Sequence, residues 1–393
     1  MFETNRRAFL SGIAAMASLP LTARLTFAAR GPEPERRFVL IILRGAADGL
    51  GIIPPVGDPD YATMRDALAF DPKRLTALDD RFSMNPALAS LEPWYRAKEL
   101  LFVHAVASQY RERSHFDAQA VLESGRDDPK RVSDGWLART LNAMEGGPRS
   151  LAIGGGVPAV LSGGKNVMTW SPGRTRVPDQ NLLERLAMIY DHDSRLSAFG
   201  PDIRRSAGLI DGAMSSQRGA SSVTQRAFGT AGQLLMADGG PTIAVISTDG
   251  WDTHHGQGLE SGRLSQAVLA LCDGLLALRG QLSDNIWAGT TILVVSEFGR
   301  TVAMNGSAGT DHGTGGLAML AGGTVAGGRV VSDWPGLSLT ALYEKRDLAP
   351  TTDTRALMKA VLREQLGVPD RVISEVAFPG SEKVKAVDGL FRS

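Results

Sequence analysis

The sequence predicts an α/β fold of three layers, with a doubly wound, mostly parallel sheet between two layers of helices. Residues 37–43 form an apolar run rich in β-branched side chains, bounded upstream by prolines, as expected of a central parallel strand. A helical stretch then leads to a second apolar run at residues 100–106, and strand–helix–strand order is typical of parallel sheets. Two later apolar runs, residues 243–246 and 292–295, lead into polar clusters, which open α/β sheets place at their carboxyl edge.

The remaining elements follow from periodicity and from the residues that interrupt it. Pro93 is expected to kink or restart the first helix, because a proline inside a helix removes a backbone hydrogen bond. The expected helices cover residues 86–97, 114–123, 258–282 and 352–366, and a further short strand covers residues 317–320. Residues 176–238 carry mostly helical patterns and are interpreted as a helical insert within a single domain, residues 30–393.

The first 29 residues have the pattern of a twin-arginine export signal. Arg6 and Arg7 stand directly before the apolar stretch 13–19, and small residues at 26–29 suit cleavage. The alternative is a chance pair of arginines before a buried helix. We expect export to the periplasm or secretion, a route that typically carries proteins already folded, often around a cofactor.

Composition excludes several other classes. Lysine plus arginine and aspartate plus glutamate each total 42 of 393 residues, without a long basic block, so nothing indicates a nucleic-acid partner. Beyond the signal, no apolar run reaches the length of a membrane span. Cys272 is the single cysteine, which excludes an internal disulfide, and its apolar helical surroundings predict a buried structural thiol.

A polar cluster after the run at 243–246 has the residue types of a metal site. Asp252 and His254 are separated by one residue and can reach one ion from a loop, and Asp249 and His255 are close enough to join or replace them. Carboxylate plus imidazole suits zinc, manganese or iron better than calcium, which prefers oxygen ligands alone. The alternative is that these side chains serve as turn and capping residues.

Two further clusters carry the same kinds of side chain. Glu297 follows a wholly apolar strand, where a carboxylate needs a metal ion or a partner such as Arg300. If Arg300 is not that partner, it can act as a bidentate clamp for an anionic substrate. Asp311 and His312 are adjacent after a glycine-rich loop and can ligate one ion or two neighbouring ions, or else form a surface turn.

The first half of the chain adds four residues to this list. Asp48 ends the first strand, either as a ligand or as a turn residue. Ser114 begins a helix, where its hydroxyl suits a nucleophile near an ion or an ordinary N-cap. His115 can orient this loop or assist proton transfer. His104 lies inside an apolar strand and is expected to be a core residue.

The order of these motifs resembles that of an exported bacterial family, the domain of unknown function 1501. The resemblance rests on the leader and on residues 43–50, 102–106, 114–119, 251–254, 296–301 and 310–313. That family is similar to the alkaline phosphatase and sulfatase superfamily, which implies an alkaline phosphatase-like fold and one or two divalent ions. By position, the resemblance implies Ser114 as the nucleophile candidate and, as ligand candidates, Asp48, Asp252, His254, Glu297 and His312. The superfamily usually has an Asp-His pair where this chain has Glu297 and Phe298.

The sequence therefore predicts an exported metal-dependent hydrolase of phosphate or sulfate esters. Metal ions would lower the charge on the ester oxygens and activate Ser114 or a water molecule, while Arg44 or Arg300 holds the anionic group. A second hypothesis is a non-catalytic exported scaffold or binding protein of the same fold. It would act with an exported partner protein, because members of the resembled family are often encoded beside another exported family.

Overall fold

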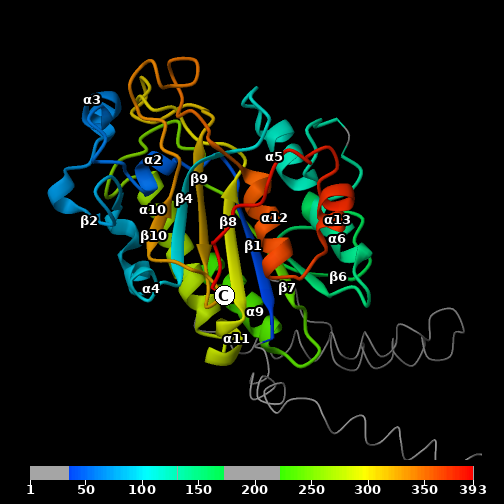
Figure 1. Ribbon diagram of the computed structural model, residues 1–393. Helices are drawn as coiled ribbons and strands as arrows, with labels where there is room; N and C mark the ends of the chain where they lie inside the picture. The colour runs from blue at the N-terminus through cyan, green and yellow to red at the C-terminus, as the bar shows by residue number, and fades with distance from the viewer. Residues whose placement is uncertain (1–34, 131, 172–221, 393) are drawn as a thin grey trace, which may run out of the picture. The chain divides into compact units, whose positions relative to one another are not determined.

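A nine-stranded sheet forms the centre of the computed structural model, which describes residues 35–130, 132–171 and 222–392. The predicted signal and most of the predicted insert lie outside these residues. The strands are β1 (Arg37–Leu43), β4 (Leu100–Ala107), β5 (Ser150–Ile153), β6 (Val167–Trp170), β7 (Ile243–Thr248), β8 (Thr290–Ser296), β9 (Gly316–Ala321), β10 (Arg329–Val331) and β11 (Thr352–Asp353). Their order is β10-β4-β9-β8-β1-β7-β5-β6, with β11 paired to β4 (Figure 1).

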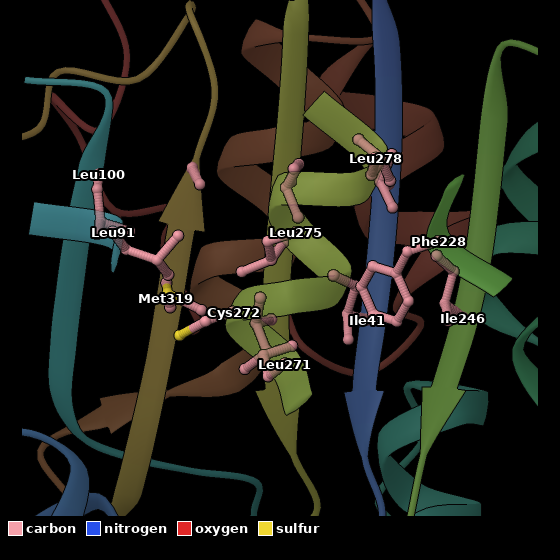
Figure 2. Close-up of a cluster of buried hydrophobic side chains, with 14 of the residues drawn as sticks. Ile41, Leu91, Leu100, Phe228, Ile246, Leu271, Cys272, Leu275, Leu278 and Met319 are labelled. Carbon is pink, nitrogen blue, oxygen red and sulfur yellow. The ribbon is translucent and has the colours of Figure 1, made fainter. Parts of the chain in front are cut away.

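One strand of the central part of this sheet runs against its neighbours. β1 pairs in parallel with β7 on one side and with β8 on the other, which confirms the central parallel strand predicted at residues 37–43. β9 pairs antiparallel with both β4 and β8, and its reversed arrow is visible in Figure 2. The residues that precede β9 therefore lie at the same edge of the sheet as the residues that follow β1, β4, β7 and β8.

Helices cover both faces of the sheet, which confirms the three predicted layers (Figure 1). One face is covered by η4 (Pro86–Leu91), α4 (Glu92–Arg96), α9 (Val223–Met236), α10 (Arg263–Arg279) and α11 (Asp284–Ala288). The other is covered by α5 (His115–Ser124), α6 (Trp136–Ala143), η5 (Ala159–Leu161), α12 (Thr354–Glu364) and η7 (Ile373–Ala377). Because both faces of the strands are buried, the strands appear in the sequence as continuous apolar runs.

Alternate side chains of β1 contribute to two separate cores. Ile41 belongs to the core between the sheet and α9 and α10, where it lies with Phe228 and Leu275 (Figure 2). Leu40, its neighbour along the strand, belongs to the opposite core with Leu357. Each such side chain contributes about 1.5–3 kcal/mol when fully buried, so the two cores hold the strand ends in fixed positions.

Several elements differ in extent from their predictions. The helix predicted at residues 86–97 is divided into η4 and α4, with Pro93 in the first turn of α4. The helix predicted at residues 258–282 begins only at Arg263, after Gly262 as its N-cap residue. Gly262 packs closely on the preceding loop, where a Cβ would lie 2.0 Å from the carbonyl oxygen of Gln257. β5 and β6 were not predicted. They have four residues each and lie in a segment rich in glycine and proline.

The remaining elements are short. They are α2 (Gly49–Ile52), α3 (Tyr61–Arg65), η2 (Asp66–Leu68), η3 (Pro72–Arg74), α13 (Asp370–Val372) and a separate pair of strands, β2 (Thr76–Ala77) and β3 (Ser83–Met84). Within the part of the chain that the structure describes, no helix combines the length and apolarity needed to cross a membrane. Cys272 on α10 is buried as predicted, and burial raises the pKa of its thiol to about 12.

Candidate metal site

Five segments of the chain bring polar side chains to the carboxyl edge of the sheet. They follow β1, β4, β7 and β8 and precede β9. His115, the first residue of α5, comes after β4, while Asp252 and His254 come after β7. His312 precedes β9. Since β9 is antiparallel to its neighbours, His312 meets the residues that leave the ends of the parallel strands.

Three imidazoles and one carboxylate converge at this edge, and we call His115, Asp252, His254 and His312 the His–Asp cluster. Nε2 of His312 lies 2.9 Å from Nε2 of His115 and 2.9 Å from Nε2 of His254. The carboxylate of Asp252 lies 3.1 Å from Nε2 of His254, 3.4 Å from Nε2 of His312 and 3.6 Å from Nε2 of His115. The Nε2 atom of His312 thus lies close to those of both His115 and His254, beside Asp252.

The second ring nitrogen of each histidine already has an oxygen acceptor. The Nδ1 contacts are Glu297 Oε1 for His115 at 2.8 Å, Asp311 Oδ1 for His254 at 3.0 Å and the carbonyl oxygen of Arg113 for His312 at 3.0 Å. These acceptors assign the proton to Nδ1 and leave the lone pair on Nε2. Lone pairs that face one another repel unless a proton or a metal ion lies between them. Histidines that ligate metals typically donate their other N–H to such an acceptor.

Close backbone packing sets the positions of Asp252 and His254. Gly45 has a φ of +119°, and a Cβ at this residue would lie 2.5 Å from the backbone nitrogen of Asp252. A Cβ at Gly309 would lie 2.3 Å from the carbonyl of His254. The backbone N–H of Gly45 also donates to Oε1 of Glu297 at 2.9 Å. The turn after β1 therefore fixes both Asp252 and the carboxylate that contacts a histidine of the cluster.

Arg300 holds Asp252 in the ionised state. Its Nη1 donates to Oδ1 of Asp252 at 2.6 Å, while Nε and Nη2 donate to the hydroxyl and the carbonyl of Thr310. Burial opposes ionisation of Asp252, but the hydrogen bond and the charge of Arg300 outweigh it, so the pKa of this carboxyl lies below its usual value. The side chain of Asp252 remains 44% exposed, which leaves it accessible to an ion from solvent.

The histidines differ in their electrostatic surroundings. The hydrogen bond with Glu297 raises the pKa of His115 and outweighs the burial of its ring. Burial lowers the pKa of His312, and the neighbouring His115 and Arg300 lower it further. Burial also opposes ionisation of Glu297, but hydrogen bonds, of which the bond from His115 is the strongest, bring the pKa of Glu297 below its usual value.

The charges around the cluster suit one divalent cation. Asp48 and Asp252 each form an ion pair with an arginine. Among the described residues, Glu297 and Asp311 form ion pairs with histidines and with no lysine or arginine. A divalent ion at the Nε2 atoms would balance these two negative charges. Zinc–nitrogen bonds of about 2.0–2.1 Å place neighbouring ligand atoms roughly 3.3 Å apart, close to the separations of the His312 Nε2 atom from its neighbours in the cluster.

The predicted ligands divide into two groups in the structure. Asp252 and His312 form one group with His115, and His254 adjoins it through the Nε2 of His312 and the carboxylate of Asp252. Glu297 and Asp311 lie behind the cluster against the Nδ1 atoms. Asp48, predicted as a ligand or a turn residue, is the N-cap of α2 and is fully buried. Its carboxylate contacts Arg65 and Gln257, each at 2.5 Å. The structure therefore places Asp48 in a neighbouring buried network and outside the cluster.

Two other predicted site residues, Asp249 and Ser114, are not members of the His–Asp cluster. Asp249 is exposed and lines a cavity of about 300 Å³ between α9 and α10 that no member of the cluster lines. Ser114 is the N-cap residue of α5, directly before His115, and its side chain makes no capping hydrogen bond. The sequence interpretation did not include His115 among the ligands. Its position at a helix start, after a strand that ends at the same edge, is the signal that could have identified it.

These features define an α/β protein with a candidate transition-metal site at the carboxyl edge of its sheet. Residues 175–377 match the model of the family described as "Protein of unknown function (DUF1501)". The chain belongs to this family, which confirms the resemblance seen in its motifs. No curated protein sequence matches the chain.

Several solved structures of hydrolases are similar to the chain. Phosphonoacetate hydrolase from Sinorhizobium meliloti 1021 is 13% identical with a TM-score of 0.32, over 70% of this chain and 59% of that chain. The PsFucS1 sulfatase from Pseudoalteromonas sp. is 13% identical with a TM-score of 0.42, over 99% and 76%. Murine ectonucleotide pyrophosphatase / phosphodiesterase 5 is 10% identical with a TM-score of 0.32, over 67% and 57%. Likeness at these scores leaves the activity of the chain open.

Proposed function

We propose that the chain is a metal-dependent hydrolase of phosphate or sulfate esters in which the His–Asp cluster holds one divalent ion. One observation carries this proposal. The Nε2 atom of His312 lies 2.9 Å from those of His115 and His254 beside the Asp252 carboxylate, while every Nδ1 atom of the cluster is occupied by an oxygen acceptor. The cluster also lies where open α/β sheets bind their ligands. The ester class is the one that the family resemblance implies.

The donor set favours a transition metal. Three neutral imidazoles and one carboxylate suit zinc, manganese or iron, whereas calcium prefers oxygen ligands alone. With a single anionic ligand the ion keeps a positive charge, and when bound it would supply Lewis acidity toward an ester oxygen or a water molecule. The protein's part is to keep Asp252 ionised through Arg300 and to hold the three imidazole rings by their Nδ1 atoms.

Arg44 is the better placed of the two arginines predicted to hold an anionic group. The side chain of Arg300 is 0% exposed and its nitrogens contact Asp252 and Thr310, so we assign it the positioning of Asp252. Arg44 is 23% exposed, and its Nη1 is anchored by Gln119 at 2.8 Å and by Glu123 at 2.9 Å. Arg44 thus combines a fixed position with a partly exposed side chain.

The test is elemental analysis of the purified protein together with turnover of an aryl phosphate and an aryl sulfate in added zinc, manganese or iron. We expect one ion per chain and hydrolysis of one of the two esters. Absence of bound metal and of turnover would refute the proposal. Bound metal without turnover, together with a co-purifying exported protein, would favour the non-catalytic binding protein instead.

Ser114 is the candidate nucleophile, and a water molecule is the alternative. A Ser114→Ala variant separates the two, because the hydroxyl makes no capping hydrogen bond that its removal would break. Loss of turnover with an unchanged metal content would assign the attack to Ser114. Retained turnover would assign it to water.

We also propose that residues 1–29 direct export by the twin-arginine route. The support is the pair Arg6 and Arg7 before the apolar stretch 13–19. Replacement of both arginines by lysine should leave the full-length precursor in the cytoplasm. Unchanged export of this variant, measured by cell fractionation, would exclude the route.

A further inference from the structure

A loop far from the cluster in sequence is fixed to the cluster by a buried ion pair. The loop comprises residues 343–347, and Asp347, its last residue, is fully buried. Its Oδ2 accepts from Nε of Arg113 at 2.9 Å and lies 2.8 Å from Nη2 of the same guanidinium. A single carboxylate oxygen thus holds the Arg113 side chain through two nitrogens.

Arg113 occupies a backbone conformation that needs such support. Its φ is +58°, in the left-handed region that costs an ordinary residue free energy. In this conformation the carbonyl of Arg113 accepts the Nδ1 hydrogen of His312 at 3.0 Å. Arg113 is also two residues before His115 in the chain. Its conformation therefore affects two of the three histidines of the cluster.

The same loop reaches His312 from a second side. Nη2 of Arg346 donates to the carbonyl oxygen of His312 at 2.7 Å. The backbone of Asp347 forms an isolated bridge with Thr301, next to the bridge between Arg300 and His312. The loop therefore contacts the backbone of His312 directly and its ring through Arg113. His312 is the histidine whose Nε2 lies 2.9 Å from the Nε2 atoms of both other rings.

We propose that Asp347 and Arg113 form a positioning pair that sets the ring orientation of His312 and the start of α5 at His115, and so tunes the affinity of the cluster for its metal. This inference rests on the proposed function for the presence of the metal. It assigns roles to two residues that contact neither the Nε2 atoms nor the Asp252 carboxylate, the atoms that would bind the metal. An ordinary structural ion pair would stabilise the fold and leave the His312 ring unaffected.

Matched substitutions on Arg113 separate these two roles. Arg113→Ala removes the guanidinium and keeps a Cβ in the left-handed conformation, whereas Arg113→Gly removes the guanidinium and adopts that conformation without strain. Zinc affinity should fall about tenfold or more in Arg113→Ala and in Asp347→Asn, the usual effect of losing support behind a ligand. Arg113→Gly should recover part of this loss.

Glu344→Gln is the control, because Glu344 contacts the same guanidinium from a 55% exposed position. It should change the affinity by less than about twofold.

A second readout does not depend on the metal. In the metal-free protein, ¹⁵N NMR of the imidazoles should show His312 protonated on Nδ1 in the parent protein and in Glu344→Gln. A mixture of tautomers is expected in Arg113→Ala.

Unchanged zinc affinity and an unchanged His312 tautomer in both Arg113→Ala and Asp347→Asn would overturn the inference. If the parent protein binds none of zinc, manganese and iron, the proposed function fails and the tautomer alone decides the positioning role. If Arg113→Ala does not fold, Asp347→Asn and Arg113→Gly decide by the same measurements.

Discussion

His104 and the histidines of the His–Asp cluster are the same side chain in two opposite situations. His104 lies fully buried within β4, where its ring stacks on Phe82 with centroids 5.3 Å apart. Its Nε2 donates to the carbonyl of Ile53 at 3.0 Å, and its Nδ1 accepts from the backbone N–H of Ala105 at 3.2 Å. Both ring nitrogens are satisfied by the backbone, so this neutral histidine is complete without a ligand.

The cluster histidines are satisfied at one nitrogen only. Each Nδ1 faces an oxygen acceptor, and the Nε2 atom of His312 faces the Nε2 atoms of the other two rings. They are also partly exposed, at 24%, 32% and 25% for the side chains of His115, His254 and His312. A structural histidine such as His104 is therefore buried with both ring nitrogens hydrogen-bonded to the backbone, whereas a candidate ligand is partly exposed and has only its Nδ1 paired with an oxygen acceptor.

The largest effect that tests this contrast is the loss of metal binding. His312→Ala removes the nitrogen that lies nearest to both other rings, so zinc affinity should fall by more than about 100-fold, measured by titration with a fluorescent competitor. His104→Gln should bind zinc like the parent protein, because His104 contributes no donor to the cluster. Equal zinc affinity of the two variants would contradict the distinction between His312 as a ligand and His104 as a structural histidine.

A smaller effect concerns stability against acid. Burial lowers the pKa of His104 to about 4, whereas an unfolded histidine titrates near 6.5. Between these values the unfolded chain takes up a proton that the folded chain excludes, so stability falls as the pH decreases. The loss amounts to about 3 kcal/mol from pH 6.5 to 4 and levels off below pH 4. Urea unfolding at several pH values should show a flatter dependence in His104→Gln than in the parent protein. Identical slopes would contradict the assignment.

Local sequence patterns predicted the centre of the sheet because its strands are buried on both faces. Residues 37–43 and 100–106 are largely apolar, with Arg37 and His104 as the exceptions, and the structure has fully buried strands at both places. β6 is only partly buried, so its four residues form no comparable run. The direction of β9 was also beyond local patterns. It depends on the chain after Glu297 turning back at the edge of the sheet, which no residue of β9 specifies.

The candidate site was predicted in its residue types more than in their roles. A ligand and the residue that supports a ligand need the same chemistry, namely a carboxylate or an imidazole at a strand end. Glu297 and His115 illustrate this, because the sequence interpretation placed the carboxylate on the metal and the imidazole beside it. The structure has the imidazole facing the cluster and Glu297 behind it. Which of the two reaches an ion depends on where α5 packs, and that is a tertiary property.

The smallest effect tests the role of Glu297 directly. Glu297 is buried, and Oε1 accepts from the Gly45 N–H, from His115 Nδ1 and from Gln119, while Oε2 contacts the Ser296 hydroxyl. A glutamine can keep its oxygen in the Oε1 position and donate its amide to Ser296, so Glu297→Gln removes the charge and preserves the geometry. If Glu297 supports His115, zinc affinity should fall only about tenfold, because the ring becomes a weaker base.

The matched variant is Asp252→Asn, which alters the carboxylate that lies among the Nε2 atoms. Zinc affinity should fall much further in this variant than in Glu297→Gln, since a ligand contributes more than the group behind it. The reverse order would restore Glu297 as the ligand predicted from the sequence. It would also mean that His115 is a structural histidine like His104, because its ring would then make contacts within the protein and bind no metal.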